Sequence, residues 1–331
     1  MVDNNSFRVS VVIPAYNVGK FIARTLDSVL AQTRRADEII VVDDGSTDET
    51  SEVVARYGDK VKYIRQENAG VGAARNTAIK AAQHQWIAFL DGDDEWLPEK
   101  LQRQMELLGR NPHLDWTTGN FYRCLCMENR RGPDISSAKA ARVLQGRDYL
   151  ENYFTGYMKG LGGWTGTMLI RKNVLEEAGL FRIGLNRADD LDMWWRIAYR
   201  WPQIGYTAQP LAIYHMQIPD SLSQGYPPAE IYCDLIKRHL QFAAEAGRLE
   251  NFQIFAAYIL RRWLRSMLFQ ARTGDIRNMV RQFNNLLPCH YQAVMYLLTV
   301  FPRATRDICH LISRIVQRFK LRNRIVRRPG K

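Results

Sequence analysis

The stretch Trp86-Ile-Ala-Phe-Leu-Asp91-Gly-Asp93-Asp94 places five apolar residues directly before a cluster of acids. Such an apolar run is typical of a strand covered on both faces, so the acids are expected at the strand's carboxyl end. In open α/β sheets, ligands bind at this edge. Three carboxylates within four residues repel one another, and a divalent cation that also carries a phosphate relieves the repulsion. The stretch therefore predicts a metal-dependent site for a phosphorylated ligand, with a solvated acidic turn as the alternative.

The residues before this stretch alternate between short β-branched runs and helical patterns. Pro14 is expected to end the first strand, because proline cannot continue a central ladder. Ser46 and Glu49 have the spacing of a capping box, so Ser46 is expected to start a helix. The alternation is typical of βαβ units and predicts an α/β fold, with a mostly parallel sheet flanked by helices. The predicted strands span residues 9–13, 38–42, 61–64 and 86–90.

The loops that follow these strands are expected at one edge of the sheet, because parallel strands bring their carboxyl ends together. Acidic, cationic or aromatic side chains recur in these loops. Solvation explains one acidic turn, but it does not readily explain this repetition. A single shared site is therefore predicted at this edge. Its members are Tyr16, Asp43, Asp44, Arg75, Asp91 and Asp93.

A glycine-rich segment lies in the second half of the chain. Residues 155–165 contain Gly156, Gly160, Gly162 and Gly163, and this density predicts a mobile loop. The same segment contains Trp164. This side chain either stacks on a sugar ring of an acceptor or anchors the loop by hydrophobic packing.

A second acidic cluster follows at Asp189 and Asp190, directly before residues with helical spacing. Both acids are therefore expected at a helix N-terminus, where the helix dipole stabilises carboxylates. They are either part of the site or plain helix caps. His215 follows them in a loop that could close over a site, although a lone histidine is more often structural. Further strands are predicted at residues 204–207 and 211–214.

Size and charge limit the class of protein. The 331 residues can bury a large core, as one domain with an appendage or as two domains. Residues 229–331 contain 19 Lys and Arg against 6 Asp and Glu, whereas residues 1–228 contain 27 against 28. The net charge of +12 thus lies in the last third of the chain, which suits an anionic membrane surface or nucleic acid. The predicted domains are residues 1–228 and residues 229–331.

The cysteines and the apolar segments predict a cytoplasmic protein. Five cysteines in no regular pattern argue against a secreted disulfide framework. No apolar leader precedes the first strand, and no stretch reaches the ~18 apolar residues of a membrane span. Residues 303–331 have the pattern of a basic amphipathic helix, which either lies on anionic lipid or packs against the protein. Residues 293–301 are apolar but too short to cross a bilayer.

Five motifs, taken in order, resemble those of family 2 glycosyltransferases of the GT-A fold. The resemblance covers roughly residues 8–223 and leaves the C-terminal hundred residues outside. It implies a Rossmann-like sheet and a nucleotide-sugar donor. The motifs are Val9–Asn17, Val41–Asp48, Asn68–Asn76, Leu90–Asp94 and Asp189–Arg196.

The resemblance implies roles for residues that bind the donor. Asp44 would accept a hydrogen bond from the nucleotide base, commonly uracil, and Arg75 would lie near the diphosphate. The remaining donor-binding residues that it implies are Pro14, Ala15, Tyr16, Asn17, Asp43, Asp91 and Gly92.

The resemblance also implies a metal site and a catalytic base. Asp93 and Asp91 would hold Mg²⁺ or Mn²⁺, with Asp93 the direct ligand and His215 a further candidate. Asp190 would be the base, beside Asp189, where the family usually has a Glu-Asp pair. One base and one displacement imply inversion at the anomeric carbon.

Two functional hypotheses follow. The first is an inverting, metal-dependent glycosyltransferase that adds a sugar, commonly from a UDP-sugar, to a glycan or lipid-linked acceptor in cell-surface polysaccharide synthesis. It would work in the cytoplasm, with residues 303–331 on the inner face of the membrane. The second is an inactive relative that binds a nucleotide or nucleic acid. The carboxylates favour the first hypothesis, and no recognisable nucleic-acid module is present, so nucleic acid is not an expected partner.

Overall fold

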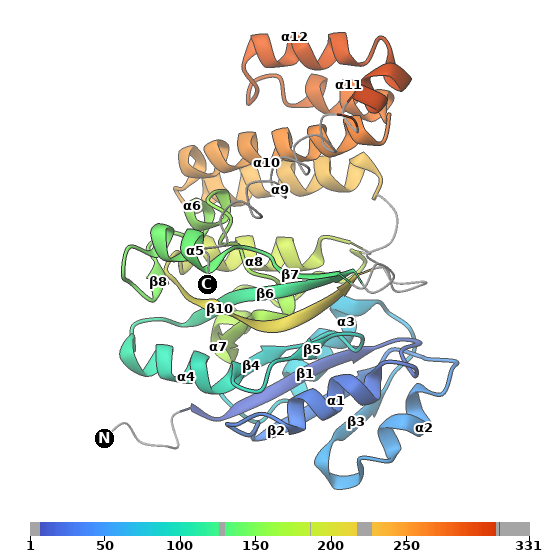
Figure 1. Ribbon diagram of the computed structural model, residues 1–331, viewed down its shortest axis with the longest axis vertical. Coiled ribbons are helices and arrows are strands. Elements are labelled where there is room, and N and C mark those ends of the chain that lie inside the picture. The colour runs from blue at the N-terminus through green and yellow to red at the C-terminus, as the bar shows by residue number, and fades with distance from the viewer. Residues whose placement is uncertain (1–6, 126–129, 186, 217–226, 309–310, 312–331) are drawn as a thin grey trace, which may run out of the picture. The chain divides into compact units, whose positions relative to one another are not determined.

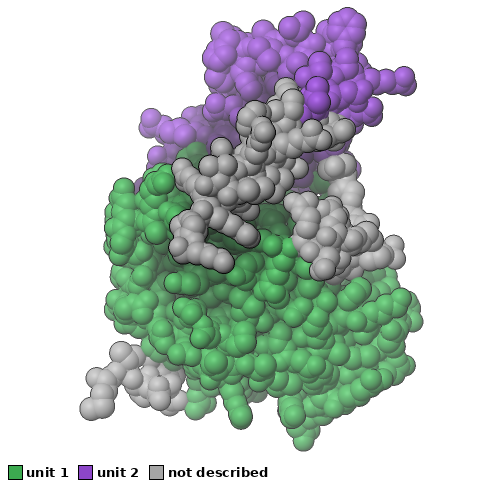
Figure 2. Space-filling model, viewed as in Figure 1, with its two compact units in different colours: residues 1–227 green, residues 228–331 purple. Residues whose placement is uncertain are grey.

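The computed structural model describes residues 7–125, 130–185, 187–216, 227–308 and 311. The chain forms two compact units, residues 1–227 and residues 228–331, which are coloured green and purple in Figure 2. The first unit contains a curved sheet with helices, and the second contains helices. The predicted α/β class with a helical C-terminal region is therefore confirmed.

In the described part of the first unit, one sheet contains ten strands in the order β3-β2-β1-β4-β9-β6-β10-β5, with β7 beside β6 and β8 beside β10 (Figure 1). Strands β3, β2, β1 and β4 are parallel, as predicted, whereas β9 runs antiparallel to both β4 and β6. The carboxyl ends of the four parallel strands therefore meet at one edge. The strands are β1 (Val9–Ala15), β2 (Glu38–Asp43), β3 (Lys62–Arg65), β4 (Trp86–Phe89), β5 (Glu95–Trp96), β6 (Trp116–Leu125), β7 (Arg130–Pro133), β8 (Tyr149–Leu150), β9 (Leu169–Arg171) and β10 (Ile204–Met216).

The prediction that Pro14 ends the first strand is wrong, because β1 continues to Ala15. Val12 O accepts a hydrogen bond from Leu90 N in the chain after β4, and Ala15 O accepts one from Asp44 N after β2. Alternate residues of β1 thus face β4 and β2, and Pro14 faces β4. The β1–β4 pairing stops at Val12, so the missing N–H of Pro14 removes no ladder hydrogen bond.

Helices cover both faces of the parallel strands. Alternate residues of β1 pack with apolar residues of α1, α2 and α4 in one core cluster. Helix α3 contacts β1 and β2 without joining that cluster, so it covers the other face. Trp194 of α8 lies on Phe89 of β4, with ring centroids 5.6 Å apart. The helices are α1 (Ile22–Leu30), α2 (Thr50–Ala55), α3 (Val71–Ala81), α4 (Lys100–Arg110), α5 (Ser137–Leu144), α6 (Tyr153–Met158), α7 (Lys172–Glu177) and α8 (Asp189–Arg200).

Three further local predictions are wrong. Helix α2 begins at Thr50 rather than at Ser46, because the Ser46 hydroxyl instead accepts a hydrogen bond from Asn17 N. Residues 155–158 are not loop but the end of α6, which Asn152 caps by accepting from the backbone N–H of Thr155. The strands predicted at 204–207 and 211–214 are one strand, β10, whose register shifts on both sides of Pro210.

The second unit consists of helices that pack in chain order: α9 on α10, α10 on α11 and α11 on α12. Tyr232 and Trp263 stack between α9 and α10 with ring centroids 4.2 Å apart. Of the helix predicted at 303–331, residues 309–310 and 312–331 lie outside the described residues. The described helices include no candidate for a membrane span. These helices are α9 (Ala229–Glu245), α10 (Leu249–Phe269), α11 (Thr273–Gln282) and α12 (Cys289–Leu298).

Candidate active site

Hydrogen bonds join the loops that follow β1 and β2. Asn17 has a positive φ of 52°, which asparagine tolerates better than most residues. Its backbone N–H donates to Ser46 Oγ at 3.0 Å, and its side-chain oxygen accepts from the backbone N–H of Thr47 at 2.8 Å. Beside it, Tyr16 is half exposed at this edge of the sheet.

Asp44 ties the end of β2 to the start of α3. Its buried carboxylate accepts hydrogen bonds from Gln66 Nε2 at 2.7 Å, Ala69 N at 3.0 Å and Gly70 N at 2.8 Å. Gly70 has a φ of +89°, a conformation that favours glycine. A carboxylate offers about four lone-pair positions, so these three bonds leave one for a ligand.

Asp43 lies fully buried beside Asp44 and makes internal contacts. Its carboxylate accepts from Ser46 N at 2.7 Å and from the Tyr63 hydroxyl at 2.5 Å. Burial and the neighbouring Asp43 raise the pKa of Tyr63 to about 12. Asp43 therefore stabilises the turn after β2, and its role in donor binding stays a prediction.

The acids after β4 form a tight turn. Asp94 N donates to Asp91 O at 3.1 Å. A Cβ on Gly92 would lie 3.2 Å from Pro14 O and 3.0 Å from Val18 Cγ2, so glycine lets this turn approach the loop after β1. Burial, followed by repulsion from Asp91, raises the pKa of Asp93 to about 6.

Asp94, the third acid, turns toward β10. Its Oδ1 accepts from the backbone N–H of His215 at 2.7 Å. Its Oδ2 is buried and has no hydrogen-bond partner among the described residues. Burial, and then repulsion from Asp93 and Asp91, raises the pKa of Asp94. The turn thus concentrates negative charge that the protein only partly compensates.

The prediction that His215 lies in a loop is wrong, because it belongs to β10. Its imidazole contacts this turn through two residues that the sequence did not mark. Its Nε2 lies 2.6 Å from Glu95 Oε1, and Arg24 Nε lies 3.1 Å from the same oxygen. Arg24 Nη2 also donates to the backbone oxygen of Asp93 at 2.7 Å. Burial and the charge of Arg24 lower the pKa of His215 despite Glu95. The imidazole therefore supports the acidic turn from the side, and its role as a metal ligand stays a prediction.

Arg75 links the two acidic clusters. Its guanidinium is buried, with Nη2 2.7 Å from Asp91 Oδ1 and Nη1 2.6 Å from Asp189 Oδ2. Burial lowers the pKa of Arg75, but the carboxylates raise it by more, so the side chain stays charged. Asp91 follows β4 and Asp189 begins α8, so Arg75 links two acids that are 98 residues apart in the sequence.

The two acids of α8 have different surroundings. Asp189 is buried against Arg75, and its pKa rises to about 6 through burial, although Arg75 opposes the rise. Asp190 is half-buried and accepts from Thr165 Oγ1 at 3.2 Å. Ala188 precedes them with a φ of +61°. Asp189 is thus engaged in an ion pair, whereas Asp190 makes no ion pair that the structure records. This difference favours Asp190 over Asp189 as a proton acceptor.

Trp164 packs within the protein. Its ring lies 4.9 Å from the Tyr214 ring and 5.4 Å from the Phe121 ring, measured between centroids. A Cβ on Gly166 would collide with the indole, so the chain lies directly against it. These contacts match the loop-anchor alternative. Contact between Trp164 and an acceptor stays a prediction.

The acidic turn has donors of the kind that Mg²⁺ and Mn²⁺ prefer. Asp91 and Asp93 supply carboxylate oxygens. Burial, followed by repulsion from Asp91, raises the pKa of Asp93, and a bound cation would favour its charged form. Among the described residues, no group of three or more His, Cys, Asp or Glu side chains forms a complete metal site. Mg²⁺ often binds through one or two carboxylates plus substrate phosphates, so the pair fits a metal that arrives with a diphosphate.

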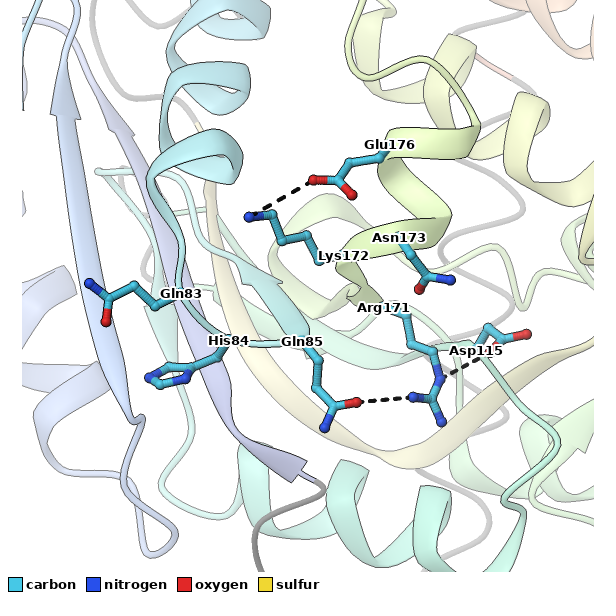
Figure 3. A pocket seen from close by; sticks show the side chains of 8 residues that line it. All are labelled: Gln83, His84, Gln85, Asp115, Arg171, Lys172, Asn173 and Glu176. Carbon is cyan, nitrogen blue, oxygen red and sulfur yellow. Dashed lines mark hydrogen bonds and ion pairs between the residues drawn. The ribbon is translucent and has the colours of Figure 1, made fainter.

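A pocket of about 650 Å³ lies at the opposite edge of the sheet, at the amino end of β4 (Figure 3). Its charged side chains pair with one another: Arg171 Nε lies 3.0 Å from Asp115 Oδ1, and Lys172 Nζ lies 3.9 Å from Glu176 Oε1. Neither cation is left unpaired to face a ligand. The residues at the carboxyl edge, rather than this pocket, therefore form the candidate active site.

Comparisons with known proteins give matches to part of the chain. Residues 10–179 match the sequence model of the family described as glycosyl transferase family 2. An uncharacterized glycosyltransferase of Nostoc sp., alr2836, is 40% identical over 148 residues, which make up 42% of this chain and 46% of that protein. The uncharacterized glycosyltransferase EpsJ of Bacillus subtilis is 34% identical over 175 residues, or 52% of this chain and 50% of EpsJ. The matched regions thus span about half the length of these relatives.

Solved structures share the fold. The crystal structure of S. aureus TarS 1–349 in complex with UDP-GlcNAc superposes with a TM-score of 0.66 at 20% sequence identity. The match covers 92% of this chain and 89% of that chain. A complex of the same protein with UDP gives a TM-score of 0.67 at 18% identity.

Proposed function

Since the chain belongs to glycosyl transferase family 2, with a GT-A fold, we propose that it transfers a sugar from a nucleoside diphosphate sugar to an acceptor hydroxyl. The observation that carries the proposal is the Arg75 bridge. This buried guanidinium holds Asp91 of the strand-end turn and Asp189 of α8 within 2.7 Å of its nitrogens. By joining Asp91 to Asp189, the bridge supports a single site in which some acids would serve a diphosphate and others an acceptor.

The donor we propose is a UDP-sugar. TarS, which has the same fold, is crystallised with UDP-GlcNAc and with UDP. In this chain, one lone-pair position of the Asp44 carboxylate would accept a base N–H. The three hydrogen bonds from Gln66, Ala69 and Gly70 hold the carboxylate in place. Pro14, Ala15 and Tyr16 adjoin Asp44 through the bond from Asp44 N to Ala15 O, so they would line the base pocket.

We further propose that the enzyme uses Mg²⁺ or Mn²⁺, held by Asp93 and Asp91. When bound, such a cation would act as a Lewis acid on the leaving diphosphate. Arg75 would contribute positive charge near the diphosphate. Its bonds to Asp91 and Asp189 use one N–H of each terminal nitrogen, and its Nε has no hydrogen-bond partner among the described residues, so donors remain beside the acidic turn.

In the transfer step, Asp190 acts as the proton acceptor. The acceptor oxygen attacks the anomeric carbon as the bond from that carbon to the phosphate oxygen breaks, and the nucleoside diphosphate leaves with the bonding electrons. The hydroxyl proton moves to the Asp190 carboxylate, which Thr165 orients. A single displacement of this kind inverts the configuration at the anomeric carbon.

The acceptor class we propose is a glycan or a lipid-linked saccharide in cell-surface polysaccharide synthesis. Two features support this acceptor class: the Asp190 carboxylate, which would take a hydroxyl proton, and the basic composition of the second unit. Residues 229–331 contain 19 Lys and Arg against 6 Asp and Glu, a balance suited to work beside an anionic surface.

Calorimetric titration of UDP, GDP and dTDP, each with and without Mn²⁺, tests the proposal. We expect UDP to bind and Mn²⁺ to tighten that binding, because diphosphate and carboxylates would share the cation. Metal-dependent binding of GDP or dTDP instead would keep the transferase proposal and change the donor. If no diphosphate binds to folded protein, the chain is better explained as an inactive relative.

A further inference from the structure

The outward side of α12 is apolar. Met295 is buried against the rest of the second unit, and helical spacing puts Leu297 on the opposite side. The exposed fractions are 50% for Val294, 68% for Leu297 and 70% for Phe301. Val300, Ile308 and Leu311, which follow the helix in the sequence, are also more than half exposed. We call the surface of Val294, Leu297, Val300, Phe301, Ile308 and Leu311 the α12 face.

The α12 face lies in a stretch of net positive charge. Residues 276–311 contain four arginines and one acid, Asp307, which pairs with Arg306 at 3.1 Å. One of the four, Arg277, donates to Thr299 Oγ1 at 2.8 Å at the end of α12. At the start of the helix, the Tyr291 hydroxyl contacts the backbone oxygen of Arg261 at 3.4 Å. The charged side chain of Arg265 also acts on Tyr291, so arginines lie beside both ends of an exposed apolar helix.

We propose that the α12 face lies on an anionic lipid surface. Apolar side chains on one side of a helix, with arginines beside them, match the pattern of helices that bind in the membrane interface. The helix spans ten residues, too few to cross a bilayer, so it would lie along the surface. The proposal is independent of the donor and the chemistry proposed above.

Charge disfavours a second copy of the chain as the occupant of this face. A symmetric contact through α12 would bring together two regions that each carry four arginines and one acid over residues 276–311, and their net positive charges would repel. Anionic lipid head groups would instead attract these arginines. Leu297 and Phe301 would insert at the boundary between the head groups and the acyl chains.

Co-sedimentation of the full chain with lipid vesicles tests the proposal. We expect binding to vesicles that contain phosphatidylglycerol and much weaker binding to pure phosphatidylcholine. Leu297→Asp combined with Phe301→Asp should weaken binding to the anionic vesicles by roughly tenfold or more. Both side chains are more than two-thirds exposed, so the native packing should survive, which a thermal melt by circular dichroism checks.

The matched control is Ile183→Asp, since Ile183 is 64% exposed and belongs to the first unit. It should bind vesicles like the wild type. A milder pair, Leu297→Ser with Phe301→Ser, should also weaken binding and stands in if the aspartates unfold the protein. The proposal is overturned if the wild type ignores anionic vesicles, or if the double variants bind as well as Ile183→Asp. It is equally overturned if light scattering finds a dimer that the double variants dissociate.

Discussion

Replacing Asp93 by asparagine should stabilise the metal-free protein near neutral pH, although it removes a carboxylate from the proposed metal site. Burial and the neighbouring Asp91 raise the pKa of Asp93 from 3.8 to about 6. The folded protein therefore binds more protons than the unfolded chain between these values. It follows that the free energy of unfolding falls as the pH rises from about 4 to about 6.

The magnitude follows from the shift in pKa. Above about pH 7 Asp93 is ionised in both states, and a rise of about two pKa units destabilises the folded state by about 3 kcal/mol. Asp93 is half-buried, so solvent screening makes this an upper value. Asparagine keeps the shape without the charge, and we expect it to raise the free energy of unfolding by about 1–3 kcal/mol at about pH 7.5. At about pH 5 the gain should shrink by about half, because the folded carboxyl is then mostly protonated.

Urea denaturation with EDTA present measures this effect at both pH values. Asp59→Asn serves as the control, because Asp59 is an exposed carboxylate in a surface turn, and we expect it to change stability by less than about 0.5 kcal/mol. Added Mn²⁺ and UDP should stabilise the wild type more than Asp93→Asn. If Asp93→Asn is no more stable than Asp59→Asn at about pH 7.5, the electrostatic description of this turn is wrong.

Three further substitutions test the rest of the site. Asp190→Asn removes the proposed proton acceptor, so transfer should fall by at least about 100-fold while UDP binding, measured by calorimetry, stays within about threefold. Transfer close to the wild-type rate would exclude Asp190 as the base. Arg75→Met leaves Asp91 and Asp189 without their shared cation and should lower the free energy of unfolding by about 2–4 kcal/mol in urea at neutral pH. The loss should be smaller in acid, where the carboxyls are protonated, and an equal loss would point to packing instead. Thr165→Val removes the hydroxyl bonded to Asp190, so kcat should fall several-fold with little change in donor KM, and Thr165→Ser should restore it. If Thr165→Ser does not restore the rate, Thr165 acts through packing rather than through its hydroxyl.

The parallel strands and their acidic ends were predictable because the signals are local. An apolar run of strand length that stops at a cluster of acids, as in Trp86–Asp94, reports both the strand and the edge where it ends. The rule that parallel strands share an edge then predicted that the loops holding Asp44 and Asp91 would meet. The local errors have an equally specific cause. Ser46 has the pattern of a helix cap, but its hydroxyl is bonded to Asn17, a residue 29 positions earlier.

The partners within the site could not be predicted, since no local pattern marks them. Arg24 and Glu95 contact the acidic turn and His215, yet neither belongs to a recognisable motif. Thr165 stands in a glycine-rich segment that offered no hint of its bond to Asp190. The exposure of Leu297 is likewise a tertiary property, because an apolar residue on a helix is buried or exposed only according to what packs on it.

The α/β class, the edge of the sheet that collects the acids, and the family motifs can all be read from the order of the residues alone. These depend on side-chain periodicity and on residues that are near one another in the chain. The bonds from Arg75 to both Asp91 and Asp189 are evident only once the chain is folded, and they leave Asp190 in different surroundings from its neighbour. That distinction depends on where a buried guanidinium finds its charge partners. A guanidinium buried in a low-dielectric interior requires charge partners, but no pattern in the sequence identifies which carboxylates they are.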